Sequence, residues 1–357
     1  MEVSYRLLRL YNFIASYTFT QTQLHHLLIR YQSLQDFKQK YVSIADNDTF
    51  PQYKISHTVL MSIEQLYDDP VVVGSSYGLF CFYGYYSGMS ITVVWNPSIR
   101  KSVSVVVPNV FHGLYENVLG FGVCGNPYDV KIVKVTYVHI WKGMQSISSV
   151  PYQVKVFELS SGVWRIPCGN LPRKSIRFTW SQVFVDGFIY WFAFDRIRSM
   201  DYDGFQSCNL IMSFDIISEE HREICLLDSL ALIVDVDNPI SKVRESLVVL
   251  EYNIYAENPV YSVWMMEDGF SKSFTKLFTI NTPGASIKTI LGFRKNGDVI
   301  VETSIKDYEA ALEVYEPCSE HINGLGIRGE VGSFYGSSYM ETLLLLDHSD
   351  CSMYSSR

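Results

Sequence analysis

The sequence has little charge and no concentration of basic residues. Its 357 residues carry 29 Lys and Arg against 37 Asp and Glu, which gives a formal net charge of −8. A nucleic-acid-binding surface needs clustered Lys and Arg to displace counterions from phosphates, so this composition argues against a nucleic-acid partner. A charged fraction of only 18%, beside 48% hydrophobic residues, also excludes a disordered chain.

Long apolar runs are missing as well. No stretch approaches the roughly 20 apolar residues of a membrane helix, so we expect no membrane partner. Arg6 and Arg9 interrupt the apolar N-terminal stretch, which argues against a signal peptide and leaves a transit peptide as the alternative. The 7 cysteines include no C-x-x-C pair, a pattern typical of reduced thiols. We therefore expect a cytoplasmic or nuclear protein.

What the sequence does contain is short runs of Val, Ile, Phe, Tyr and Trp separated by Gly, Asn, Asp and Pro. This pattern predicts strands and turns through nearly the whole chain after the first 40 or so residues. In the clearest unit, Asp186-Gly187 predicts a tight hairpin turn, because both positions of such a turn need positive φ. The strands predicted around it are Gln182–Val185, Phe188–Phe192, Leu210–Phe214 and Arg222–Leu226.

Similar four-strand units recur along the chain. They begin near Val71, Leu119, Leu232 and Thr289. Their spacing of roughly 40–60 residues is that of β-propeller blades. The half-units at Leu27–Ala45 and Ser333–Leu346 would pair to close a ring and remove exposed sheet edges. We predict an all-β fold, a β-propeller of about six four-stranded blades, with a seventh blade or an irregular β-sandwich as alternatives. Its predicted blade cores include Trp95, Trp191 and Phe214.

Two motifs imitate catalytic or cofactor sites. Gly120–Gly125 spells the dinucleotide fingerprint G-x-G-x-x-G, and Gly74–Gly78 spells the nucleophile elbow G-x-S-x-G. Both motifs require a helix to follow, whereas here each is followed by a predicted strand. We predict instead that the glycines let strands pack closely and that Ser76 is a structural hydroxyl. No metal-ligand spacing is present either, so we expect no catalysis, cofactor or metal.

Several segments match, in order, the motifs of one family. Gly74–Cys81 reads G-S-S-Y-G-L-F-C, Val94–Lys101 reads V-W-N-P-S-I-R-K, and Val185–Trp191 reads V-D-G-F-I-Y-W. Further matching segments begin at Gly120, Val156, Ile211 and Tyr339. Together they resemble the plant F-box proteins that carry an F-box-associated domain, a group that includes the S-locus F-box proteins.

The resemblance implies a kelch-like propeller over residues 27–347 that binds a protein target, followed by a flexible tail at 348–357. In this family an F-box precedes the propeller and binds the Skp adaptor of a cullin ubiquitin ligase. Here only its tail is recognisable, in residues 1–26, as a short helical remnant. Leu10 and Tyr17 stand where the family has Trp and Pro, so we expect weakened adaptor and cullin binding. The remaining adaptor contacts would be Leu10, Tyr11, Phe13 and Ile14.

The resemblance therefore implies a substrate-recognition subunit of an SCF-type E3 ubiquitin ligase, which is not itself an enzyme. One alternative is a stand-alone interaction protein without an F-box, or a truncated gene product, that competes with full-length relatives. Another is a sugar-binding or enzymatic propeller, since carbohydrates also bind aromatic-lined blades.

A target-binding face can be predicted from the loops. In antiparallel blades the tight turns lie at one end, and the longer loops lie at the other. Trp, Tyr and Arg often dominate binding energy. The long loops carry Trp141, Arg196, Arg198, Tyr202 and Phe205, which we predict to form this face. The alternative is that Trp141 and Phe205 pack back onto neighbouring blades as loop anchors.

Overall fold

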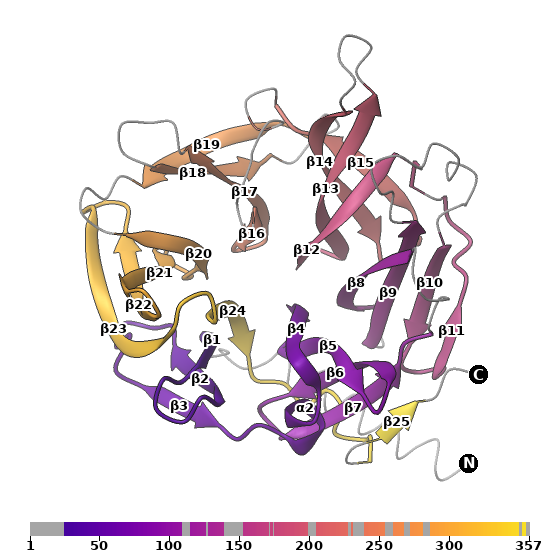
Figure 1. The fold of residues 1–357 in the computed structure, drawn as a ribbon, viewed down its shortest axis with the longest axis horizontal. Helices are drawn as coiled ribbons and strands as arrows, with labels where there is room; N and C mark the ends of the chain where they lie inside the picture. Colours follow the sequence, from indigo (N-terminus) through magenta and orange to yellow (C-terminus); the bar gives the residue numbers. More distant parts are fainter. Residues whose placement is uncertain are drawn as a thin grey trace.

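The computed structural model describes residues 25–108, 115–125, 128–138, 153–170, 172–173, 175–198, 205–227, 230, 239–253, 260–267, 272–280, 286–349 and 352–354. These residues form a ring of six β-sheets, the blades of a propeller (Figure 1). The predicted fold and blade number are confirmed. The predicted helical remnant lies outside the described residues, except for His25 and His26, which belong to a strand.

Five blades are built from consecutive antiparallel strands, with the first strand of each nearest the centre of the ring (Figure 1). The first blade contains β4 (Tyr67–Ser76), β5 (Leu79–Tyr86), β6 (Met89–Asn96) and β7 (Lys101–Val106). The second contains β8 (Tyr115–Cys124), β9 (Asp129–Val138), β10 (Gln153–Glu158) and β11 (Val163–Arg165). The third contains β12 (Ile176–Val185), β13 (Phe188–Arg198), β14 (Phe205–Asp215) and β15 (His221–Cys225).

The fourth blade contains β16 (Ile240–Val243), β17 (Ser246–Asn253), β18 (Val260–Met266) and β19 (Phe274–Ile280). The fifth contains β20 (Ile287–Phe293), β21 (Val299–Lys306), β22 (Glu309–Glu316) and β23 (His321–Glu330). The sixth contains β24 (Tyr335–Met340), β1 (His25–Gln32), β2 (Gln39–Ala45) and β3 (Lys54–His57). A short helix, α2 (Met61–Glu64), leads from the sixth blade into the first.

The sixth blade joins the two ends of the described chain, as predicted. β24 is its innermost strand and pairs antiparallel with β1, so that His26 lies opposite Tyr339. The division differs from the prediction, because one C-terminal strand combines with three N-terminal strands. Two features explain why the sequence does not predict this division of strands. β3 is a four-residue edge strand with almost no buried side chain, and Leu343–Leu346 forms turns instead of a strand.

One further strand prediction needs correction. The innermost strand of the fourth blade is Ile240–Val243, not Leu232–Val236, and residues 231–238 lie outside the described chain. Its hairpin turn places Arg244 at a φ of 53° without any glycine, so the usual sequence signal is missing. The tail predicted to be flexible contributes β25 (Ser352–Tyr354), which pairs in parallel with β7. This pairing covers an otherwise open sheet edge.

The predicted packing roles of the motif residues are confirmed. Trp95, Trp191 and Phe214 are fully buried. The Trp191 indole donates a hydrogen bond to the Leu119 carbonyl of the neighbouring blade, at 3.0 Å. A Cβ on Gly120 would lie 2.1 Å from the Trp191 ring, so only glycine permits this approach. The apparent dinucleotide motif therefore serves blade packing.

The hairpin turns have the backbone conformations that their residues predict. Asp186 and Gly187 have φ values of 45° and 80°, as the tight hairpin requires. Tyr77 and Gly78 adopt the same conformation, with an aromatic residue where Asn or Asp is usual. Ser76 is buried, and its hydroxyl accepts a hydrogen bond from the Val123 amide at 3.0 Å. It joins the first and second blades, which confirms its structural role.

Candidate functional site

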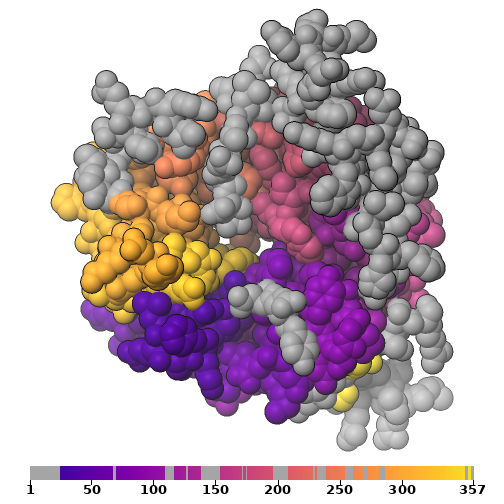
Figure 2. All heavy atoms as spheres, viewed as in Figure 1, coloured from indigo at the N-terminus to yellow at the C-terminus, as the bar shows by residue number. Residues whose placement is uncertain are grey.

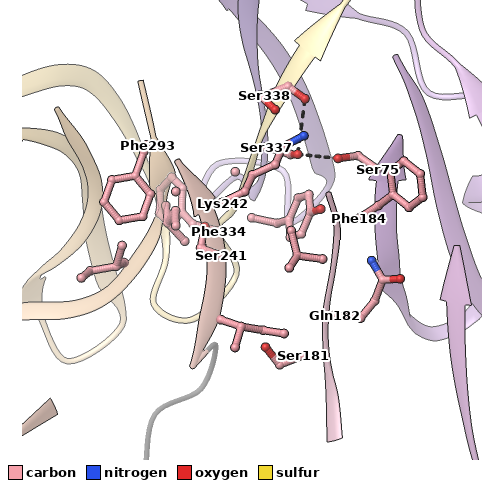
Figure 3. A pocket seen from close by; sticks show the side chains of 17 residues that line it. Ser75, Ser181, Gln182, Phe184, Ser241, Lys242, Phe293, Phe334, Ser337 and Ser338 are labelled. Atoms are coloured by element: carbon pink, nitrogen blue, oxygen red, sulfur yellow. Dashed lines mark hydrogen bonds between the residues drawn. The ribbon is translucent and has the colours of Figure 1, made fainter. Parts of the chain in front are cut away.

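A cavity of about 90 Å³ lies at the centre of the ring, where the innermost strands of five blades meet. The space-filling view shows the ring hollowed at this point (Figure 2). β4, β12, β16, β20 and β24 all contribute to its wall, which therefore brings together parts of the chain that lie far apart in sequence. Its most polar residues are Ser75, Ser181, Gln182, Ser241, Lys242 and Ser337 (Figure 3).

Two hydroxyl groups on one side of the cavity join the first and sixth blades. The hydroxyls of Ser75 on β4 and Ser337 on β24 are hydrogen-bonded at 2.5 Å (Figure 3). The Tyr335 phenol lies beside both of them. Burial raises the pKa of Tyr335 above its usual value of 10.0, so the phenol keeps its proton and remains a donor. This side of the cavity is neutral and rich in O–H groups.

Gln182 on β12 lies next to β4 in the cavity wall. Its Oε1 accepts a hydrogen bond from the Phe121 amide at 2.9 Å, which fixes the direction of the side-chain amide. Its Nε2 is buried and has no hydrogen-bond partner among the described residues. A Cβ on Gly74 would lie 2.2 Å from this Nε2, so the glycine of β4 makes room for the amide. The Gln182 amide therefore lies between β4 and β8, with its unpaired Nε2 buried against Gly74.

Lys242 on β16 brings the single charge to the cavity wall. Its side chain is half-buried, and its amine has no hydrogen bond or ion pair among the described residues. Among the described residues that line the cavity there is no Asp or Glu. Burial lowers the pKa of the Lys242 amine below its usual value of 10.5, and the charge of Glu245 only partly opposes this. Burial of an uncompensated ammonium is unfavourable, which explains the direction of the shift.

The remaining wall is apolar. It is formed by Val183, Phe184, Ile240, Ile290, Leu291, Phe293 and Phe334. Phe184 also contacts Tyr77 of the first blade, with ring centroids 6.5 Å apart, and Tyr77 contacts Tyr128 at 5.2 Å. The Tyr77 side chain is 40% exposed at the tight-turn end of the ring. Aromatic surface is therefore available at this end, where the turns themselves are short.

The predicted target-binding residues are only partly described. Arg196 and Arg198 end β13, and Phe205 begins β14, so these positions lie in paired strands and not in a loop. Arg198 is opposite Phe205 in the register, which brings their backbones together at one end of the third blade. The side chains of these three residues, together with Trp141 and Tyr202, lie outside the described residues. The face remains a prediction.

The predicted adaptor contacts cannot be placed either. Leu10, Tyr11, Phe13 and Ile14 all lie outside the described residues. Within the described chain, no group of three His, Cys, Asp or Glu residues could hold a metal ion. The described helix is far too short and polar to cross a membrane.

Sequence reasoning missed the cavity residues. Lys242 was not predicted as a cavity residue, because the strand that carries it was expected too early in the chain. A lysine inside a short strand between Ile240 and Val243 is the signal that could have revealed it. Gln182 and Ser75 lay in predicted strands or motifs, but no local pattern indicates which strand positions of different blades meet at the axis.

Comparison with known proteins gives one strong match. A family model described as the F-box associated beta propeller domain matches residues 30–308. A search of curated proteins gives no match.

The solved structures that match include three distant likenesses. A β-fructofuranosidase from Bombyx mori is 10% identical with a TM-score of 0.38, and the match covers 72% of this chain and 62% of that one. Hydrazine synthase from Kuenenia stuttgartiensis is 8% identical with a TM-score of 0.35, covering 82% and 90%. An α-L-arabinofuranosidase from Lactobacillus brevis is 8% identical with a TM-score of 0.31, covering 74% and 86%. Likenesses this distant carry no argument about function.

Proposed function

We propose that this chain, which belongs to the F-box associated β-propeller domain family, is the substrate-recognition subunit of an SCF-type ubiquitin ligase. The family match over residues 30–308 carries the proposal. The closed ring supports it, because a rigid scaffold can present binding loops in fixed positions. This role places the protein in the cytoplasm or nucleus.

The proposed mechanism is binding without chemistry by this chain. The propeller holds a protein target, and the N-terminal segment holds the Skp-type adaptor and, through it, the cullin. Holding both partners raises the effective concentration of the target near the ubiquitin-loaded enzyme. We assign target binding to Trp141, Arg196, Arg198, Tyr202 and Phe205, and adaptor binding to Leu10, Tyr11, Phe13 and Ile14.

The test is a pull-down of the full chain with purified Skp adaptor and cullin. We expect the adaptor to be retained at micromolar strength, because Leu10 and Tyr17 replace the Trp and Pro of the motif they resemble. A Leu10→Ala, Phe13→Ala variant should lose the adaptor while keeping its melting temperature. An exposed substitution distant in sequence from this segment, Tyr308→Ala, is the matched control and should bind like the wild type.

The same two replacements favour a second candidate, a stand-alone interaction protein that competes with full-length relatives for targets. In that case the chain would bind targets without retaining the adaptor at any concentration. The pull-down therefore separates the two functions, because only the ligase subunit requires a ternary complex with cullin.

A further inference from the structure

We propose that the central cavity is a binding site for a carboxylate group, with the Lys242 ammonium as its charged anchor. The inference does not depend on the ligase proposal, since it rests on the cavity wall alone. The carboxylate could belong to a free small acid or to an acidic side chain of a bound protein. The experiment below distinguishes these sources.

The charge of the cavity wall is unbalanced. Lys242 supplies an ammonium, whereas the lining residues that the structure describes include no Asp or Glu. Glu245 is the acidic residue whose charge acts on Lys242, but it is exposed at the hairpin turn and forms no ion pair with the amine. A half-buried cation without a partner is unfavourable, and a bound anion would remove that penalty. The wall is therefore complementary to a negative charge.

The neutral polar groups around Lys242 can also bind a hydrogen-bond acceptor. Gln182 lines the cavity from β12, the innermost strand of the adjacent blade, and its Nε2 has no hydrogen-bond partner among the described residues. The hydroxyls of Ser181, Ser241 and Ser337 line the same space. Hydroxyl and amide donors can satisfy the oxygens of a carboxylate, and hydrogen bonds to a charged acceptor are stronger than neutral ones. The donors surround the cavity instead of lying on one surface.

Size and charge favour a carboxylate over a phosphate. A cavity of about 90 Å³ is small, and its single cation matches a single negative charge. Phosphate sites usually combine several cations or backbone N–H groups, which this wall does not show. Phe184, Leu291 and Phe334 provide an apolar surface for the methyl or methylene group that carries the carboxylate. We therefore infer a short carboxylic acid or a single Asp or Glu side chain.

The experiment measures binding of acetate to the full chain by calorimetry and by thermal melting, with chloride as the reference salt. The test variant is Lys242→Met, which keeps the length of the side chain and removes its charge. The matched control is Lys288→Met, because Lys288 is an exposed lysine on another innermost strand. We expect saturable acetate binding to the wild type and to the control, and at least a tenfold loss in the test variant.

Thermal melting keeps the test informative if binding is weak. Acetate should raise the melting temperature of the wild type but not that of Lys242→Met. Without ligand, Lys242→Met should melt at the wild-type temperature or above, because it removes an uncompensated charge. If Lys242→Met fails to fold, Lys242→Gln serves as the second variant and should weaken acetate binding, because it also removes the charge.

A peptide arm identifies the source of the carboxylate. A short Gly-Ser peptide with one central Glu is compared with the same peptide carrying Gln. Competition of the Glu peptide with acetate assigns the site to protein-borne carboxylates, and acetate binding alone assigns it to free acids. No saturable acetate binding, or equal binding by wild type and Lys242→Met, would overturn the proposal.

Discussion

The interface between the second and third blades is held by close apolar packing and buried charges. The closing seam, meaning β24 with residues 341–348 and the strands they contact, adds hydrogen-bonding hydroxyls and amides and two imidazoles to its apolar contacts. At the former, Trp191 packs on Gly120, and Glu219 receives hydrogen bonds from Lys131 and Arg165. At the latter, the Asn96 amide donates to the carbonyls of Thr342 and Leu344. The two contacts should therefore respond to different perturbations.

The difference follows from how each contact is formed. The second and third blades are consecutive in sequence, so large side chains can interlock as each blade folds onto its neighbour. The seam joins residues about 300 positions apart, as in the pairing of Arg30 with Tyr335. Directional hydrogen bonds, such as those from Asn96 and between Ser98 and Tyr339 at 2.7 Å, fix the register at this late contact. We infer that packing sets most of the stability, whereas the seam sets the register.

The largest effect is expected from Trp191→Ala. The change empties a fully buried site and leaves the Leu119 carbonyl without its donor, so it should destabilise the fold by roughly 3–5 kcal/mol. Chemical denaturation measures this loss. Trp180→Ala is the matched control, because Trp180 is 38% exposed and should cost much less. Similar losses for both variants would contradict the packing account.

A smaller loss is expected from Glu219→Gln, because it removes the carboxylate shared by two cations. The side chains of Glu219 and Lys131 are 8% and 10% exposed, so this ion pair is poorly solvated, whereas the Arg165 side chain is 40% exposed. We expect a loss of roughly 3 kcal/mol, measured by denaturation at neutral pH. Glu220→Gln on the next, exposed residue should be nearly neutral. An equal effect of the two changes would refute a role for the network.

The same carboxylate has a pH signature. Burial acts to raise the pKa of Glu219, but hydrogen bonds from Arg165 and Lys131 outweigh it, so the pKa lies below its usual 4.5. The folded state therefore binds the proton less readily than the unfolded state. Its stabilising contribution is present above about pH 4.5 and is lost as the pH falls further.

The seam should weaken at a higher pH than the ion-pair network. Burial lowers the pKa of His26 and His57 below 6.5, because their neutral forms are favoured inside the fold. Glu341 and Asp46 partly oppose this at His26, and Arg100 adds to it at His57. The unfolded chain takes up protons first, so stability falls as the pH drops below about 6.5.

His221 of the third blade, whose pKa burial lowers to about 4, contributes a loss of stability in the same range, so we expect a total loss of roughly 2–3 kcal/mol between about pH 7 and pH 5, measured by denaturation at each pH. His26→Phe should reduce this dependence, since an aromatic ring can still contact Tyr339. His321→Phe, an exposed site on β23, should leave it unchanged. A flat profile in the wild type would show that the seam histidines do not couple to folding.

The smallest effect is expected at the C-terminal strand. Tyr354 of β25 packs on Phe157 with ring centroids 5.8 Å apart and lies against Gly162. Because β25 is short and lies at a sheet edge, Tyr354→Ala should cost about 1 kcal/mol. The neighbouring exposed residue, Met353, provides the control through Met353→Ala. No difference between the two variants would show that β25 adds little to the first blade.

Much of the ring could be predicted because its signals are local. Alternating apolar runs and the Asp186-Gly187 turn identify strands from a few residues, and the blade spacing repeats them. The core role of Trp95 in the W-N-P-S segment could also be predicted from its local sequence. Its neighbours Asn96 and Ser98 bind the far end of the chain, and no local pattern shows this.

The rest depended on long-range contacts or on missing turn signals. β16 was misplaced because its turn uses Arg244 and Glu245 in place of glycine. β3 and β25 are short edge strands whose side chains have little apolar pattern. The cavity forms only where five strands that are distant in sequence meet. The residues next to Lys242 and Gln182 in the sequence therefore do not indicate that these two line a cavity.

The central claim is that the ring binds a target for ubiquitin transfer, and a reconstituted ubiquitination reaction tests it most directly. The full chain is assembled with Skp adaptor, cullin and the ubiquitin-loaded enzyme, and modification of captured proteins is compared with that by Trp141→Ala, Tyr202→Ala. We predict that both chains retain the adaptor and melt at the same temperature, but that only the wild type yields cullin-dependent products. Equal products from both chains, or none from the wild type, would contradict the account.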